Sequence, residues 1–203
     1  MDVTKKPGYE TTEHLWSPNS KILKKYVDKK IIPFLKVNPG DHCFDLGEAN
    51  PRMEYIKERL HIDVTQINLE DFNFDSIPPY RPRHAVFALE VVEHLQNPLW
   101  FMRELKKLAG DGAIYVILPE QPRWLWHPMH FFEMDKKHFE KWILKPLDLK
   151  IVRYKKIIFV SSWKKYLIGF RPLLKLITGK TTIYEMIRSL LYVKWGIYEI
   201  RKN

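Results

Sequence analysis

The stretch HAVFALEVVEHLQNPLWFMRELKKLAGDGAIYVIL, residues 84–118, carries three structural signals in succession. Residues 84–89 form an apolar run that predicts a buried strand. An Asn-Pro pair at 97–98 then opens an amphipathic helix, which Gly110 ends. The apolar stripe of this helix recurs at helical spacing, at Phe101, Leu105 and Leu108. Residues 113–118 are a second continuous apolar run, typical of a strand buried on both faces of a parallel sheet.

The same alternation of strands and helices extends on both sides of this unit. Upstream, residues 42–46 and 64–67 are expected to be strands, and the helix between them begins with Asn50 as its cap and Pro51 at its first position. Downstream, the pattern predicts a helix and two final strands, at residues 135–144, 150–160 and 197–201. The sequence therefore predicts an α/β fold, a Rossmann-like doubly wound and mostly parallel sheet with helices on both faces.

The composition fits one well-packed domain. The chain has 203 residues, of which 45% are hydrophobic and 14% aromatic, and such a composition excludes a disordered or fibrous class. The expected parts of this single domain are an N-terminal helical segment, a core, a basic amphipathic insertion and a last strand, at residues 1–36, 37–160, 161–194 and 195–203. One cysteine, Cys43, excludes an intramolecular disulfide framework. With no secretory leader and no apolar run of about 18 residues, we expect a cytoplasmic protein.

The positive charge gathers in the last quarter of the chain. Residues 1–148 have a net charge of −1, whereas residues 149–203 have a net charge of +11. Such asymmetry predicts contact with an anionic partner. Two amphipathic stripes within 161–194 favour a peripheral position on an anionic membrane surface over binding of nucleic acid. The alternative is a lid packed on the sheet with its lysines in water.

Polar residues follow three of the expected strands, where ligands bind in open α/β sheets. Residues 88–119 contain E-V-V-E-H at 90–94, N-P at 97–98, R-E-L at 103–105, G-D-G at 110–112 and a proline at 119. With these motifs the segment resembles the class I S-adenosylmethionine-dependent methyltransferases of the small-molecule and lipid type. Asp45-Leu46-Gly47 lies at the right distance upstream to be the family's glycine-rich loop. The likeness covers about residues 37–144.

The resemblance implies a site for S-adenosyl-L-methionine. The residues assigned to this cofactor are Asp45, Gly47, Glu48, Ala49, Asn68, Leu89 and Glu90. The loop departs from the family's pattern because Ala49 and Pro51 replace glycines, which adds a Cβ and fixes a φ angle. Asn68 replaces an acidic residue that holds the ribose, a role that Glu70 or Asp71 takes if the register shifts. A catalytically inert scaffold that binds a partner through its basic tail is therefore an alternative to an enzyme.

Acidic and imidazole side chains cluster after the third expected strand. Glu90, Glu93 and His94 are spaced so that a helical segment would place them on one side. His94 or His130 is the candidate general base for an acceptor hydroxyl. Glu90, Glu93, His94 and His130 also form a candidate site for a divalent metal. This set resembles the metal site of small-RNA 3′-terminal 2′-O-methyltransferases, and the plainer alternative is that Glu93 and His94 make only surface or capping hydrogen bonds.

The function expected from these residues is methyl transfer from S-adenosylmethionine, most simply to a hydroxyl on a small-molecule or lipid-linked acceptor. In this reaction the protein mainly aligns donor and nucleophile. A metal-dependent RNA 2′-O-methyltransferase is the second alternative. The fold and the donor site do not identify the acceptor, because many acceptors share them.

Overall fold

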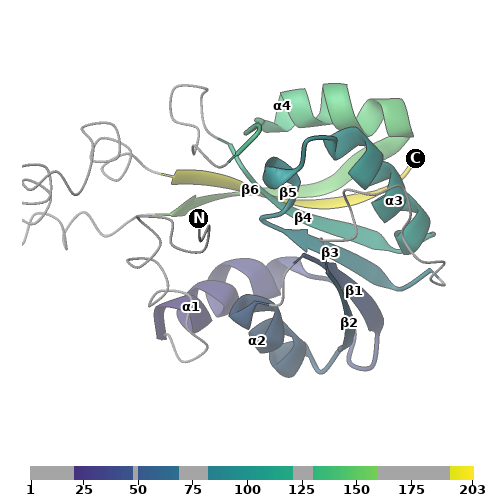
Figure 1. Ribbon diagram of the computed structural model, residues 1–203. Helices are drawn as coiled ribbons and strands as arrows, with labels where there is room; N and C mark the ends of the chain where they lie inside the picture. Colours follow the sequence, from purple (N-terminus) through teal and green to yellow (C-terminus); the bar gives the residue numbers. More distant parts are fainter. Residues whose placement is uncertain (1–20, 48–49, 69–81, 121–129, 160–192) are drawn as a thin grey trace, which may run out of the picture. The chain divides into compact units, whose positions relative to one another are not determined.

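The computed structural model describes residues 21–47, 50–68, 82–120, 130–159 and 193–203 (Figure 1). The longer elements are, in chain order, α1 (Lys21–Tyr26), β1 (His42–Leu46), α2 (Pro51–Leu60), β2 (Asp63–Ile67), β3 (Ala85–Leu89), α3 (Pro98–Ala109), β4 (Ala113–Pro119), α4 (Lys136–Phe139), β5 (Leu149–Phe159) and β6 (Val193–Lys202). Shorter helical turns are η2 (Val27–Ile31), η3 (Ile32–Phe34), η5 (Val92–His94), η7 (Glu140–Leu144) and η8 (Lys145–Leu147). The basic insertion expected at 161–194 falls almost wholly outside the described residues, and the single domain expected over 1–203 stays a prediction.

The six strands form one mixed sheet in the order β2-β1-β3-β4-β6-β5. β1 runs parallel to both β2 and β3, whereas β5 and β6 are antiparallel. The predicted α/β sheet is therefore confirmed. Because the chain goes from β1 to β2 on one side and comes back to β3 on the other, the topological switch point lies between β1 and β3.

The chain divides into two compact units, of which the first comprises Met1–Ala88 and Leu105–Tyr115. In this unit α1 and α2 are neighbours, as Figure 1 shows. Met53 and Ile56 of α2 are buried, as the helical spacing predicts. Asn50 caps α2 as expected, since its Oδ1 accepts from the N–H of Met53 at 3.0 Å.

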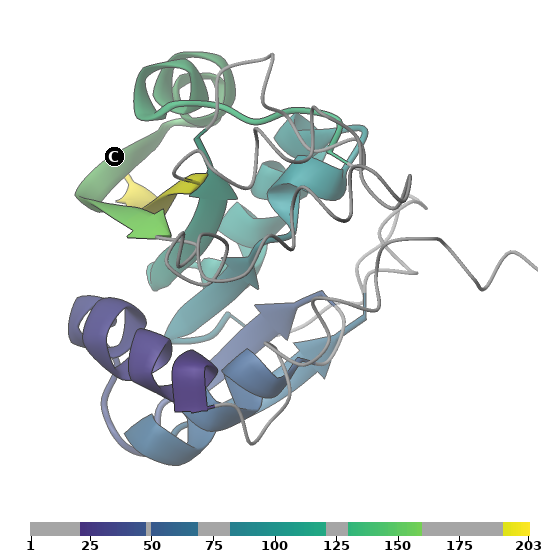
Figure 2. The same cartoon turned by 90° about the vertical axis from the view of Figure 1, so that its left-hand side faces the viewer.

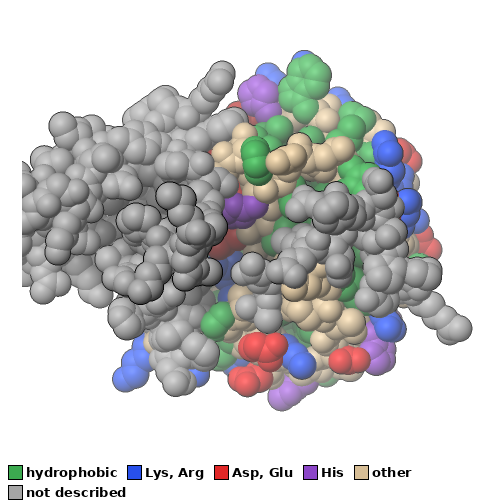
Figure 3. Space-filling model, viewed as in Figure 1, with side chains coloured by type: hydrophobic (Ala, Val, Ile, Leu, Met, Phe, Trp, Pro, Cys, Tyr) green, Lys and Arg blue, Asp and Glu red, His purple; other side chains and the backbone are tan. Residues whose placement is uncertain are grey.

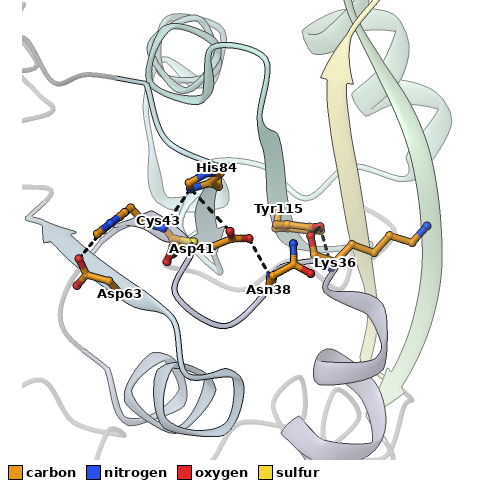
Figure 4. A network of polar contacts seen from close by, with 8 residues as sticks. Lys36, Asn38, Asp41, Cys43, Asp63, His84 and Tyr115 are labelled. Carbon is orange, nitrogen blue, oxygen red and sulfur yellow. Dashed lines mark hydrogen bonds and ion pairs between the residues drawn. The ribbon is translucent and has the colours of Figure 1, made fainter.

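A polar network joins the amino-terminal ends of the strands in the first unit (Figure 4). The Asp41 carboxylate accepts from the N–H of Asn38 at 2.8 Å and lies 3.9 Å from Nδ1 of His84. The Tyr115 hydroxyl accepts from the N–H of Lys36 at 2.9 Å. In parallel strands these groups occupy the edge opposite the carboxyl ends, so they belong to the scaffold and not to the expected site.

The second unit comprises Leu89–Glu104 and Val116–Asn203. α4 and the turns after it lie over β5 and β6 (Figure 2), and the Phe139 ring packs edge-on to Tyr198 with the ring centres 5.2 Å apart. The helix expected at 135–144 is α-helical only to Phe139 and then widens into the π-helical turn η7. This wider turn brings the adjacent residues Ile143 and Leu144 to the buried side together.

The last strand is longer than the sequence indicates. β6 begins at Val193, because it pairs with β5 over the whole length from Val193 opposite Phe159 to Lys202 opposite Leu149. Gly196 interrupts the apolar pattern of this strand, so the pattern alone marks only residues 197–201. Among the described residues, no helix has the length and apolar character needed to cross a bilayer.

Candidate functional site

The carboxyl end of β1 places Asp45 at the switch point of the sheet. Asp45 is opposite Gln66 of β2 and Phe87 of β3 in the strand register. Its side chain is buried, with the residue only 1% exposed, and no donor among the described residues reaches its Oδ2. A carboxylate oxygen in this position is available to a ligand that brings its own donor.

Burial raises the pKa of the Asp45 carboxyl to about 7. The Gln66 amide and the buried Arg52 oppose this shift. The Gln66 Nε2 also donates to the backbone oxygens of Asp45, at 3.2 Å, and of Gly47, at 2.6 Å. Gln66 of β2 thus holds the end of β1 in place. With this raised pKa, the Asp45 carboxyl changes its charge near neutral pH.

Gly47 turns the chain out of β1 with a φ of +138°. Side chains rarely adopt this conformation, so glycine suits the position. Its N–H donates to the oxygen of Ile67 at 3.1 Å, which keeps the start of the loop against β2. Asn68 follows β2 directly and is exposed. Glu48 and Ala49, which were also assigned to the cofactor, lie outside the described residues.

Glu90 follows β3 in an unusual backbone conformation. Leu89 is buried, and Glu90 adopts a φ of +64°, which is uncommon for a residue other than glycine. The N–H of Glu90 donates to the oxygen of Ile117 in β4 at 3.0 Å, which fixes the turn. The assignment of Glu90 to the cofactor stays a prediction.

A compact group of metal-ligating side chains lies in the second unit. Ligand atoms of Glu93, His94 and His130 are all within 4.8 Å of one another. Glu93 is fully buried, whereas His94 is exposed to solvent. The rings of His94 and His130 meet edge to face with their centres 4.6 Å apart. The N–H of Phe131 donates to the oxygen of Glu93 at 2.9 Å and so holds two distant parts of the chain together.

Glu133 orients the His130 ring. Its Oε1 lies 2.7 Å from Nδ1 of His130, and the Glu133 side chain is fully buried. Because a carboxylate accepts, this contact assigns the proton to Nδ1 of His130. Three of the four residues expected to bind metal are therefore brought together, and Glu90 is not in the group found among the described residues. The role of Glu133 was missed, although its spacing of three from His130 was the available signal.

Comparisons with known proteins show the fold of the chain. No family model and no curated protein matches it. Among solved structures it is similar to a candidate sarcosine dimethylglycine methyltransferase from Galdieria sulphuraria, with 12% identity over 91% of this chain and 85% of that one, and a TM-score of 0.60.

Two further similar structures differ in their chemistry. One is a mycolic acid cyclopropane synthase complexed with SAH (S-adenosylhomocysteine) and CTAB, with 12% identity, coverage of 89% and 84%, and a TM-score of 0.53. The other is the cyclase SpnF, with 14% identity, coverage of 88% and 81%, and a TM-score of 0.51. The likeness therefore establishes a shared fold, and the reaction has to be argued from the residues of this chain.

Proposed function

Because the chain has the class I methyltransferase fold, we propose that it binds S-adenosylmethionine and transfers the methyl group to a hydroxyl of a small-molecule or lipid-linked acceptor. The observation that carries this proposal is the end of β1. There a buried carboxyl and a glycine with positive φ lie at the switch point of a methyltransferase-type sheet.

Asp45 is the residue of this site that best fits the cofactor. Its Oδ2 has no donor among the described residues, and an ammonium group such as that of S-adenosylmethionine would supply one. Gly47 lets the backbone approach closely. The contacts of Glu48, Ala49, Asn68, Leu89 and Glu90 with the cofactor stay predictions from the resemblance.

In the proposed reaction the protein positions the acceptor and removes a proton. S-adenosylmethionine supplies an electrophilic methyl on a sulfonium, which leaves as a neutral thioether. The acceptor oxygen forms the new bond to carbon, and His94 or His130 takes the hydroxyl proton. His130 suits this role because the Glu133 carboxylate, 2.7 Å from its Nδ1, orients the ring.

Isothermal titration with S-adenosylmethionine and S-adenosylhomocysteine tests the cofactor proposal. We expect binding, and Asp45→Asn should weaken it about tenfold or more, since a charge-assisted hydrogen bond is lost. Asp63→Asn is the matched control, because Asp63 is exposed and stands at the amino-terminal end of the neighbouring strand β2, away from the carboxyl ends of the strands. No binding by the folded wild-type protein would favour the inert scaffold that Ala49 and Pro51 suggest.

A second candidate function is a divalent metal site at Glu93, His94 and His130. Two imidazoles and one carboxylate suit Mn²⁺ or Zn²⁺, and the Glu133–His130 pair supplies the outer-shell orientation that such sites use. When bound, the metal would act as a Lewis acid on the acceptor oxygen. Glu90 as a fourth ligand stays a prediction.

Metal content after incubation with Mn²⁺ or Zn²⁺ and gel filtration tests this site without any activity assay. We expect one ion per chain, lost in His130→Ala. His138→Ala is the matched control, because His138 also pairs with a carboxylate three residues away, that of Asp135, and both side chains are exposed. Equal metal content in all three proteins would refute the site. Binding of a single-stranded RNA at low salt would be needed, in addition, for an RNA acceptor.

A further inference from the structure

The turns after α4 expose a face that combines an indole with positive charge. His138, Lys141, Trp142 and Lys145 are all exposed and recur at a spacing of three and four residues. The opposite side carries the buried residues Phe139, Ile143, Leu144 and Leu147. We call the four exposed residues the Trp142 face. Figure 3 shows green, blue and purple side chains standing together over α4.

Trp142 is too exposed to be part of the core. It is 56% exposed, whereas the neighbouring Ile143 is 5% exposed. The ammonium of Lys141 lies over its ring, 4.6 Å from the centroid. A large amphipathic ring beside lysines is the arrangement that proteins place at the boundary between lipid headgroups and acyl chains, because the ring enters the boundary while the ammonium groups stay at the headgroups.

The charge around this face complements an anionic surface. Residues 135–156 contain eight lysines and arginines and three acidic residues, a net charge of +5. Two of the three carboxylates are engaged within the protein: Asp135 accepts from the N–H of His138 at 2.9 Å, and Asp148 accepts from Nδ2 of Asn203 at 2.9 Å. This range shares residues 149–156 with the basic last quarter of the chain, residues 149–203, whose net charge is +11.

From this face we infer that the protein docks on an anionic lipid bilayer through Trp142, Lys141 and Lys145. Lipid fits better than nucleic acid, because the face offers one aromatic ring on a convex helical surface, whereas binding of single strands uses successive rings in a groove. The site is distinct from the basic insertion at 161–194, and it does not depend on the methyl-transfer proposal. It would place the protein where a lipid-linked acceptor is found.

Co-sedimentation of the full chain with vesicles tests the inference. The vesicles are phosphatidylcholine alone, or phosphatidylcholine in which phosphatidylserine replaces part of the lipid. We expect binding to the anionic vesicles that falls as salt rises. The double change Lys141→Glu with Lys145→Glu should reduce binding about tenfold or more. Trp142→Ala should reduce binding to anionic vesicles several-fold while leaving its salt dependence in place, because it removes the apolar part of the contact.

Matched controls separate this face from general charge and general hydrophobicity. Arg103→Glu with Lys107→Glu makes the same charge change at the same spacing of four residues on α3, where both residues are exposed. Phe131→Ala removes another aromatic side chain that is 57% exposed. Both control proteins should bind as the wild type does.

Three outcomes would overturn the inference. The first is equal binding to neutral and anionic vesicles. The second is wild-type vesicle binding by the Lys141 and Lys145 variant, which would assign any membrane contact to another part of the chain. The third is an equal loss in the control variants. If the Lys141 and Lys145 variant lost binding to a single-stranded oligonucleotide but kept vesicle binding, the face would be a nucleic-acid surface instead.

Discussion

At the scale of single residues, Asp45 links folding to pH. The pKa of a free aspartate is about 3.9, and burial raises that of Asp45 to about 7. Between these values the folded state binds more protons than the unfolded state, so stability falls as pH rises from about 4 to about 7. Asp45→Asn removes this dependence. Relative to the variant, the wild type should lose on the order of a few kcal/mol across that range, measured by urea unfolding.

The sign of this effect distinguishes Asp45 from an ordinary ion-paired carboxylate, whose contribution to the stability of the folded state grows as pH rises. Asp63→Asn is the control, because Asp63 is exposed and its carboxylate meets His42 at 2.7 Å at the surface. If the difference in stability between wild type and Asp45→Asn were the same at every pH, Asp45 would be ionised throughout. The protein would then have to supply its partner from residues outside the described part.

Gly196 lies where a side chain has no room. A Cβ there would clash with Oε1 of Glu120 and lie 2.6 Å from the Tyr198 hydroxyl oxygen. The hydroxyls of Tyr198 and Tyr154 both donate to the Glu120 carboxylate. Burial and this contact raise the pKa of each phenol. Gly196→Ala should therefore cost about 1–3 kcal/mol through crowding, measured by chemical denaturation.

A second glycine isolates steric crowding from backbone conformation. Gly40 has a φ of +83° and nothing within 4 Å of the position of a Cβ. Gly40→Ala should cost about 1 kcal/mol through conformation alone. A neutral Gly196→Ala would show that the strand shifts to admit the methyl group and that Glu120 is not rigidly held.

At the scale of elements, two helix caps of different chemistry predict different responses to pH. Asn50 caps α2 with a neutral oxygen, and Asp135 caps α4 with a carboxylate. The N–H of His138 lowers the pKa of Asp135. The contribution of Asp135 to the free energy of unfolding is therefore present above its pKa in the unfolded chain and is lost as pH falls through its pKa in the folded protein. Asn50→Ala should cost about 1 kcal/mol at all pH values, and Asp135→Ala about the same at neutral pH but little in acid.

Thermal or urea unfolding of both variants, from neutral pH downward until the Asp135 carboxyl is protonated, measures these costs. Each variant serves as the control for the other, because both lose one cap oxygen that accepts from the residue three positions later. An Asp135→Ala cost that did not change with pH would mean that the protonated carboxyl caps α4 as well as the carboxylate does.

The elements also show what local sequence can predict. β3 and β4 are short, continuous apolar runs, and β1 is mostly apolar. Such strands are buried by the sheet itself, so their positions follow from composition. The caps at Asn50 and Asn97 follow from local hydrogen bonding, and Asn97 does accept from the N–H of Trp100 at 3.0 Å. The widened turn η7 and the start of β6 depend on what each segment packs against, which local patterns do not contain.

The candidate sites were predicted only in part, for the same reason. The acidic and imidazole residues at 90–94 could be found because they are adjacent in sequence. Their approach to His130 depends on the hydrogen bond from Phe131 to Glu93, a contact across 38 residues. The orientation of His130 by Glu133 is a property of the folded protein as well, because the fold buries the Glu133 side chain against the ring.

At the scale of the whole molecule, cofactor binding must appear as added stability of the fold. A ligand that binds only the folded state at about 100 times its Kd adds about 2.7 kcal/mol. For a chain of this size that corresponds to a rise in Tm of about 5–11 °C. S-adenosylhomocysteine should therefore raise the Tm of the wild type, measured by calorimetry, and should raise that of Asp45→Asn less at the same concentration.

The comparison with Mn²⁺ separates the two proposed sites by the same measurement. The Tm of His130→Ala should still rise with S-adenosylhomocysteine but no longer with Mn²⁺. The reason is that His130 belongs to the candidate metal site in the second unit, whereas Asp45 lies in the first unit. If the wild type unfolds cooperatively and neither ligand raises its Tm, both proposed sites would be refuted. The positive charge of residues 149–203 would then be the best guide to function, since a scaffold needs only a surface that its partner recognises.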